Sequence, residues 1–217
     1  MTKFKAVLFD LDGTLLDTLQ DLADSTNRAL DCLGFPPHGI VAYRHFVGDG
    51  RDVLAFRALP EDRRDSATVR KLVAEIDEDY TKHWADSTGP YPGIPELLDA
   101  LMDRGVSVAV LSNKSHNFTE LMVLRMLARW HFDAVIGATV NAPKKPDPAL
   151  AVKIAHQLKI QPSGFIYLGD SDVDMKTAIA AGMYPVGARW GFRSAGELLA
   201  SGAKMVIDQP CDLLRLL

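Results

Sequence analysis

Six short apolar runs constrain the fold of this chain more than any other feature of its sequence. They cover residues 6–9, 106–111, 133–137, 165–168, 184–187 and 204–207. Short apolar runs without a helical period are typical of strands that are buried on both faces. Helical patterns separate most of them, and strands that alternate with helices form parallel sheets. The sequence therefore predicts an α/β fold with a doubly wound parallel sheet.

One interval between strands is much longer than the others. About 90 residues separate the first two strands, far more than a single crossover helix requires. Helical patterns in this interval cover 17–33, 41–46, 51–59 and 67–86. Elsewhere, helices are expected over 94–104, 115–130, 147–158 and 172–181. We therefore expect an inserted α-helical domain over 17–87 and a core formed by 1–16 and 88–217.

Composition and charge exclude several classes of protein. Hydrophobic residues form 47% of the 217-residue chain and charged residues 24%, which is the balance of a globular protein rather than of a disordered or collagen-like one. With 24 basic and 28 acidic residues and no basic block, the chain has no electrostatic match for nucleic acid. We expect no nucleic-acid partner.

The N-terminus and the cysteines indicate a cytoplasmic location. The first apolar run is interrupted at Asp10, after about five residues, whereas a signal peptide needs about 7–15. No stretch approaches the roughly 20 apolar residues of a membrane span. Cys32 and Cys211 lack CxxC partners and are expected to be reduced thiols.

Two carboxylates, Asp10 and Asp12, follow the first predicted strand directly. Ligands of open parallel sheets bind outside the carboxyl ends of the strands. Gly13 allows a sharp turn that brings both carboxylates to the same ligand-binding edge of the sheet. One of them could act as a nucleophile and the other as a proton donor. Turn and capping roles for the pair are the alternative.

Polar residues also follow the next strands. Ser112 and Asn113 suit a phosphate at the start of a helix, although both are ordinary capping residues as well. Lys144 and Lys145 lie between prolines, so that one of them is a fixed cation unless the pair is simply solvated.

Three further acids follow the fourth predicted strand. Asp170 and Asp174 are four residues apart and share one face of the first helical turn, with Asp172 between them. Clustered carboxylates repel one another unless a cation neutralises them. Hard oxygen ligands with room for phosphate and water suit Mg²⁺.

In order, these segments resemble the four signatures of the haloacid dehalogenase (HAD) superfamily, and of its phosphatases in particular. The segments read Asp-x-Asp-Gly-Thr-Leu, Ser-Asn-Lys, Lys-Pro-Asp-Pro and Gly-Asp-Ser-x-x-Asp. The resemblance extends from Phe4 to about Leu217. It implies a HAD-like core with an inserted helical cap.

The resemblance implies catalytic roles for four residues. Asp10 would be the nucleophile, and Asp12 the general acid and base. Ser112 would hold the transferring phosphoryl group, and Lys145 would offset negative charge on the nucleophile and the phosphate. Lys144 competes for this last role, but Lys145 directly precedes the proline that aligns with the family signature.

The resemblance also implies Mg²⁺ as the cofactor. The side chains of Asp10 and Asp170 would bind the ion together with the backbone carbonyl of Asp12. Asp174 would ligate or support it.

The segment around Gly48, Gly50 and Arg51 is similar to the cap loop of phosphoglycolate phosphatases. The two glycines can present amides to an anion, and the planar guanidinium of Arg51 can bind a carboxylate. A glycine-rich connector with a solvated arginine is the alternative. Thr14 and Asn113, from the first and second signatures, would add contacts to the substrate.

These features predict a magnesium-dependent phosphatase that hydrolyses a small phosphorylated metabolite through an aspartyl-phosphate, with 2-phosphoglycolate as the leading candidate. A β-phosphoglucomutase-like phosphotransferase or a pyrophosphatase on the same scaffold is the alternative. Dehalogenase chemistry does not need the proton donor Asp12, and nothing marks Lys71 or Lys82 of the cap as the Schiff-base lysine of a phosphonatase. An inactive regulatory or binding relative would be a different class, although every expected catalytic residue type is present. A monomer or homodimer without a membrane partner is expected.

Overall fold

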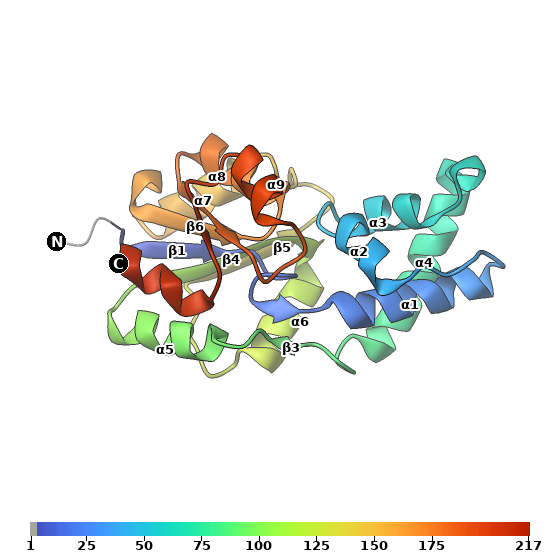
Figure 1. Ribbon diagram of the computed structural model, residues 1–217, viewed down its shortest axis with the longest axis horizontal. Coiled ribbons are helices and arrows are strands. Elements are labelled where there is room, and N and C mark those ends of the chain that lie inside the picture. The colour runs from blue at the N-terminus through green and yellow to red at the C-terminus, as the bar shows by residue number, and fades with distance from the viewer. Residues whose placement is uncertain (1–3) are drawn as a thin grey trace. The chain divides into compact units, whose positions relative to one another are not determined.

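The computed structural model describes residues 4–217 and contains a six-stranded, entirely parallel sheet with the order β5-β4-β1-β6-β7-β8 (Figure 1). The strands are β1 (Ala6–Phe9), β4 (Ser107–Ser115), β5 (Ala134–Ala138), β6 (Phe165–Gly169), β7 (Tyr184–Ala188) and β8 (Met205–Ile207). Strand β1 lies in the middle, and the chain winds outward from it in both directions. This arrangement confirms the predicted doubly wound sheet.

Helices cover both faces of the sheet. They are α5 (Ile94–Asp103), α6 (His116–Met126), α7 (Ala149–Gln157), α8 (Asp172–Ala181) and α9 (Ala195–Ala200). Helices α5 and α6 lie on one face, and α7, α8 and α9 lie on the other (Figure 1). Short 3₁₀ helices cover Pro162–Gly164 and Pro210–Leu216.

The core explains why the apolar runs form central strands. All four residues of β1 are buried, as are all five of β6. One continuous apolar cluster joins β1, β4 and β6 to the inward faces of α7 and α8. Because each strand is apolar on both faces, both faces can be buried only if the strand lies between two layers of helices.

Strand β4 and helix α6 differ from the sequence expectation. The strand continues through Ser115, with an irregularity in its register between Leu111 and Ser115, so Ser112 and Asn113 belong to a strand end and not to a helix start. The helix ends at Met126, whereas the sequence pattern extended it to residue 130. The chain turns after Leu127, and the indole of Trp130 donates a hydrogen bond to Asp99 at 2.7 Å.

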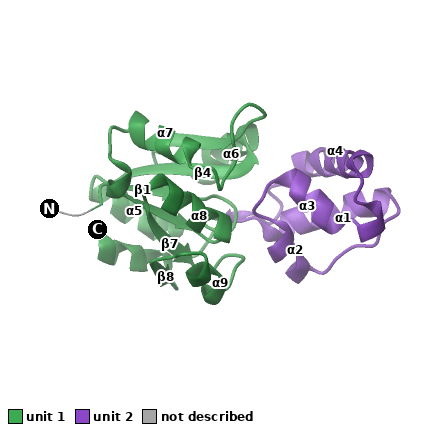
Figure 2. Ribbon diagram, turned by 90° about the horizontal axis from the view of Figure 1, so that it is seen from above, with its two compact units in different colours: residues 1–16, 90–217 green, residues 17–89 purple. Residues whose placement is uncertain are grey.

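The chain divides into two compact units (Figure 2). Unit 1 is the chain up to Leu16 together with Pro90–Leu217, and unit 2 is Asp17–Gly89. Unit 2 contains α1 (Leu19–Cys32), α2 (Ile40–Phe46), α3 (Arg51–Ala58), a 3₁₀ turn (Glu61–Arg63) and α4 (Ser66–His83). Its core is a cluster of aliphatic side chains from α1, α3 and α4.

Two features at the ends of unit 2 have no counterpart in the sequence expectation. Strands β2 (Leu16–Asp17) and β3 (Gly89–Pro90) form a small two-stranded sheet. Within unit 2, the buried carboxylate of Asp21 accepts hydrogen bonds from the backbone amides of Ser87 and Thr88 and from the Thr88 hydroxyl, at 2.7–3.0 Å. Two-residue strands and a carboxylate bonded to residues 66 positions away leave no periodic signal in a sequence.

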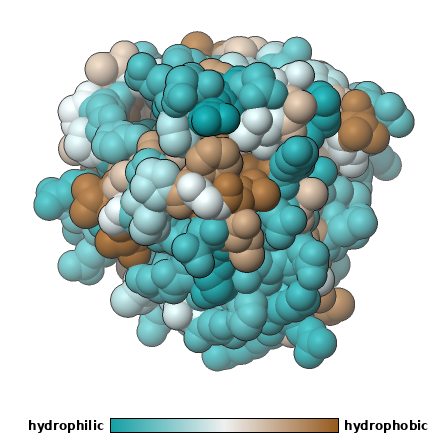
Figure 3. All heavy atoms as spheres, turned by 90° about the vertical axis from the view of Figure 1, so that its right-hand side faces the viewer, coloured by the Kyte–Doolittle hydropathy of each residue, from teal (hydrophilic) through white to brown (hydrophobic). Residues whose placement is uncertain are grey.

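The face of the molecule that Figure 3 shows is mostly hydrophilic, with apolar side chains in small groups. Scattered apolar residues of this kind are normal on a globular protein. Among the helices of residues 4–217, none is long and apolar enough to cross a membrane.

Candidate active site

Asp10 lies directly after β1, at the carboxyl end of the central strand. Its side chain is almost fully buried, and its Oδ1 accepts a hydrogen bond from the Leu11 amide at 2.7 Å. The turn that follows requires Gly13, which has φ +84°. A Cβ at this position would lie 2.4 Å from Oδ2 of Asp170, so the turn and its close approach both exclude a side chain.

Lys145 supplies the positive charge beside Asp10. Its Nζ lies 2.8 Å from Oδ1 of Asp10 and 2.6 Å from Oδ1 of Asp174, and 2% of its side chain is exposed. Lys144 is exposed. Of the two lysines that the sequence left in competition, the structure brings Lys145 into the cluster.

Asp170 follows β6, and both of its carboxylate oxygens accept hydrogen bonds from other residues of unit 1. Its Oδ2 accepts the Phe192 amide at 2.7 Å, and its Oδ1 accepts the Thr14 hydroxyl at 3.1 Å. Thr14 is therefore bonded to a proposed metal ligand, at a position where the sequence suggested a contact to substrate.

Asp174 lies in the first turn of α8, and both of its oxygens are used. Oδ2 accepts the amide and hydroxyl of Ser171 in a capping box, at 3.1 and 2.6 Å. Oδ1 accepts Lys145, with the Tyr167 hydroxyl at 3.4 Å. These contacts fit the supporting role better than the direct-ligand role, the two options that the sequence left open.

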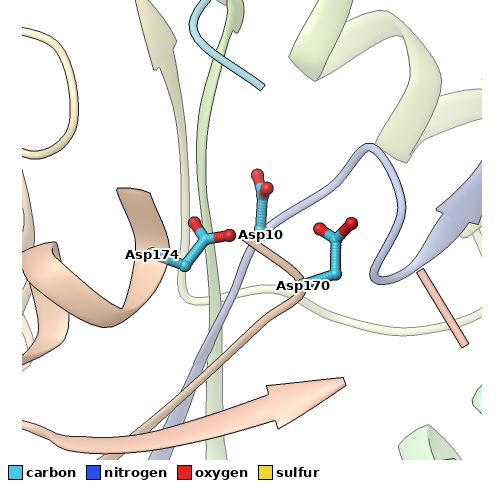
Figure 4. Close-up of side chains that lie close together, drawn as sticks. All are labelled: Asp10, Asp170 and Asp174. Carbon is cyan, nitrogen blue, oxygen red and sulfur yellow. The ribbon is translucent and has the colours of Figure 1, made fainter. Parts of the chain in front are cut away.

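The three carboxylates lie together at the strand ends (Figure 4). Asp10, Asp170 and Asp174 each offer a ligand atom within 4.8 Å of the others. Three buried carboxylates face one buried ammonium, so the group carries two excess negative charges when all are ionised. A divalent cation with hard oxygen ligands would balance that charge, and the donor set fits Mg²⁺.

Burial and the crowding of negative charge shift the pKa values of the cluster. Burial, followed by the charge of Asp174, raises the pKa of Asp10 well above its usual value, and Lys145 offsets this only in part. Burial and Asp174 likewise raise the pKa of Asp170 to about 7. Burial lowers the pKa of Lys145, but Asp10 and Asp174 outweigh burial and the net pKa is raised, so the lysine stays charged.

Asp12 has a different partner. Nζ of Lys114 lies 3.2 and 3.4 Å from its two carboxylate oxygens, and both side chains are largely buried. The carboxylate of Asp12 is not among the three of the cluster. No role for Lys114 is predicted from the sequence, because its partner lies 102 positions away.

The end of β4 brings Ser112 and Asn113 to the same edge of the sheet, and both are buried. The Ser112 hydroxyl accepts the Lys114 amide at 3.2 Å. The side chain of Asn113 binds the backbone of Lys145, with Oδ1 accepting its N–H at 2.9 Å and Nδ2 donating to its C=O at 3.1 Å.

The loop after β7 completes the surroundings of Asp170. Besides the Phe192 amide, it contributes the Trp190 indole, which donates to the backbone oxygen of Thr14 at 3.0 Å. A Cβ on Gly191 would lie 2.3 Å from Cβ of Asp170. The loop after β7 therefore holds a carboxylate of the cluster.

The three predicted cap residues belong to unit 2. Gly48 and Gly50 have φ of +122° and +92° and precede α3. Arg51 begins that helix and forms an ion pair with Asp77 of α4, with 53% of the arginine side chain exposed. This ion pair lies within unit 2.

Comparison with known proteins identifies the fold. Residues 7–188 match the family described as haloacid dehalogenase-like hydrolase. A phosphoglycolate phosphatase of Pseudomonas putida is 35% identical over 97% of this chain and 78% of its own length. A phosphoglycolate phosphatase of Chromobacterium violaceum is 31% identical over 98% of this chain and 96% of its own.

Solved structures agree with this match. The crystal structure of a predicted phosphoglycolate phosphatase from Haemophilus somnus has a TM-score of 0.91 and 27% identity, over 100% of this chain and 99% of that one. The parallel sheet, the acidic strand ends and these matches confirm the resemblance read from the sequence: this chain belongs to the haloacid dehalogenase-like hydrolases.

Proposed function

We propose that this protein is a magnesium-dependent phosphatase that hydrolyses a small phosphomonoester, with 2-phosphoglycolate as its preferred substrate. The observation that carries the proposal is the position of Asp10, buried at a strand end between Lys145 and two further carboxylates. Membership of a hydrolase family supports it, as do relatives 31–35% identical that are named phosphoglycolate phosphatase.

The side chains of Asp10 and Asp170 would hold Mg²⁺ with the Asp12 carbonyl, and Asp174 would support the site through Lys145. When bound, the ion would offset negative charge on the phosphoryl group and on the carboxylates. The charge excess of the buried cluster and its oxygen donors support this assignment.

The side chains would divide the reaction into two displacements. A carboxylate oxygen of Asp10 attacks phosphorus, and the bond from phosphorus to the leaving oxygen breaks as Asp12 donates a proton to that oxygen. Asp12 then removes a proton from water, whose oxygen attacks phosphorus as the bond from phosphorus to the Asp10 oxygen breaks, which releases phosphate and restores the Asp10 carboxylate. Two easier steps replace one difficult displacement.

The remaining residues would orient and stabilise. Lys145 would offset charge on Asp10 and on the transferring group, and the Ser112 hydroxyl would bind a phosphoryl oxygen. Lys114, paired with both oxygens of Asp12, would hold the acid and base in place between the two steps.

The setting of the reaction follows from the same proposal. The protein would bind a small phosphorylated metabolite, with no nucleic-acid or membrane partner, and would act in the cytoplasm as a monomer or homodimer. The mildly acidic net charge of −4 supports the absence of a polyanionic partner.

A phosphate-release screen tests this function. Wild-type enzyme and Asp10→Asn are assayed on 2-phosphoglycolate, pyrophosphate, a hexose phosphate, a nucleotide and p-nitrophenyl phosphate, with Mg²⁺ and with chelator. Magnesium-dependent release that is fastest on 2-phosphoglycolate, and absent in the variant, is expected. A tenfold preference for another substrate overturns the substrate assignment. Transfer of the phosphoryl group to a sugar would indicate a phosphotransferase, and inactivity on all substrates would contradict the proposal.

A further inference from the structure

Lys145 lies in a connection without regular backbone pairing. Strand β5 ends at Ala138 and α7 begins at Ala149, so neither a sheet ladder nor a helix fixes the backbone of the lysine. Yet its ammonium lies within 2.8 Å of one carboxylate and 2.6 Å of another, with almost no exposure. Something outside this connection must place the backbone.

Asn113 makes the contacts that can do so. Its amide oxygen accepts the N–H of Lys145 at 2.9 Å, and its amide nitrogen donates to the C=O of the same residue at 3.1 Å. Two opposed hydrogen bonds to one residue fix both its position and its rotation, as a neighbouring strand would. Both groups are buried, where such bonds are not exchanged for bonds to water.

We propose that Asn113 is a positioning residue that fixes the backbone of Lys145 to the end of β4, so that the ammonium stays beside Asp10. The inference rests on the proposed function. It replaces the contact to substrate that the sequence suggested for Asn113, because the side-chain amide directs both its oxygen and its nitrogen to Lys145.

Unit 2 contains a matched control. There the amide of Asn27 binds the backbone of His38 in the same way, with Oδ1 accepting the N–H and Nδ2 donating to the C=O, both at 2.9 Å. Neither residue has a role in the proposed chemistry. Oδ1 of Asn27 also accepts the Tyr43 hydroxyl at 2.7 Å, so removing this amide costs the fold the same pair of hydrogen bonds and one bond more.

The first experiment compares Asn113→Ala with Asn27→Ala on the preferred phosphomonoester. A small displacement of a catalytic group costs on the order of 100-fold in rate, so Asn113→Ala is expected to lower kcat by about 10- to 100-fold and to change KM by less than about threefold. Asn27→Ala is expected to lose at least as much stability in urea and to keep kcat within about twofold. Unchanged kcat in Asn113→Ala, or equal losses in both variants, would overturn the inference.

A double-mutant cycle identifies the residue through which Asn113 acts. In a Lys145→Arg background, the addition of Asn113→Ala should cost less than about threefold, since the lysine it positions is already absent. A full additional loss, or a loss expressed in KM, would mean that Asn113 contacts the substrate. If Asn113→Ala does not fold, Asn113→Asp takes its place under the same criteria, because it keeps the acceptor and loses the donor. An inactive wild type contradicts the proposed function instead.

Discussion

Two ion-paired side chains, Lys145 of unit 1 and Arg51 of unit 2, differ sharply in their burial. In unit 1, Lys145 is 2% exposed and bridges two buried carboxylates. In unit 2, Arg51 pairs with Asp77 and is 53% exposed. Breaking a buried pair costs about 3–5 kcal/mol, whereas an exposed pair contributes about 0–1 kcal/mol. A fold does not need the costly arrangement for stability, so the buried pair indicates function and the exposed pair by itself does not.

The largest effect should follow removal of the nucleophile. Asp10→Asn keeps the shape of the side chain but removes the attacking carboxylate, and phosphate release should fall by at least about 10³-fold with an unchanged circular-dichroism spectrum. The control is Asp172→Asn, whose carboxylate lies nearby but pairs with Lys176 on the surface. Activity in Asp10→Asn above a few per cent of wild type would remove Asp10 from its role.

The next largest effects should distinguish the roles of two buried carboxylates, Asp170 and Asp174. Asp170→Asn should lower Mg²⁺ affinity by at least about tenfold and leave the metal-free fold intact, because that side chain is a proposed ligand. Asp174→Asn should lower the free energy of unfolding by about 1.5–3 kcal/mol, since a charge-assisted hydrogen bond to Lys145 is weakened while Asp10 still pairs with the lysine. Calorimetric titration and urea unfolding measure the two quantities. Equal metal affinity in both variants would contradict the division of roles.

A role for Arg51 in substrate binding would contradict the contrast between the buried and the exposed ion pair. If its guanidinium recognises the carboxylate of 2-phosphoglycolate, Arg51→Ala should lower kcat/KM on that substrate by about 10- to 150-fold, the cost of about 1.5–3 kcal/mol for one charge-assisted hydrogen bond. Hydrolysis of p-nitrophenyl phosphate, which has no carboxylate, should be nearly unchanged. Asp77→Ala serves as the control for the ion pair. Equal losses on both substrates would assign Arg51 to the fold of unit 2.

The smallest expected effect concerns the loop after β7, which binds Asp170. Gly191→Ala would place a Cβ 2.3 Å from Cβ of Asp170, and the displaced loop should lower kcat by about tenfold. Gly196→Ala is the matched control, because the nearest atom to a Cβ there is Oγ of Ser194 at 4.0 Å. Phosphate-release kinetics of the two variants should differ. Identical rates would mean that the loop after β7 does not position the carboxylate.

Local patterns predicted the fold and the centre of the site. The apolar runs placed Asp10 and Asp170 at the carboxyl ends of two strands, and such ends meet at one edge of a parallel sheet. The structure adds that these two strands, β1 and β6, are neighbours. The register of β4 beyond Leu111 could not be read in this way, since Ser112 and Asn113 are also good helix caps. The helix at 115–130 was too long because an apolar period does not record where the chain turns.

Contacts between residues that are distant in the sequence could not be predicted. Lys114 binds Asp12 across 102 positions, and Asn113 binds Lys145 across 32. Backbone donors leave no trace in residue type, so the Phe192 amide that binds Asp170 could not be found. These contacts depend on packing that only the folded chain supplies.

The central claim is that Asp10 receives the phosphoryl group. It is tested most directly by mixing wild-type enzyme with 2-phosphoglycolate and Mg²⁺, quenching in acid within one turnover, and locating covalent phosphate by peptide mass spectrometry. The account predicts a phosphoryl group on the peptide that contains Asp10, absent from Asp10→Asn and lost as phosphate is released. Steady turnover with no label on that peptide, or with label on another residue, would contradict it.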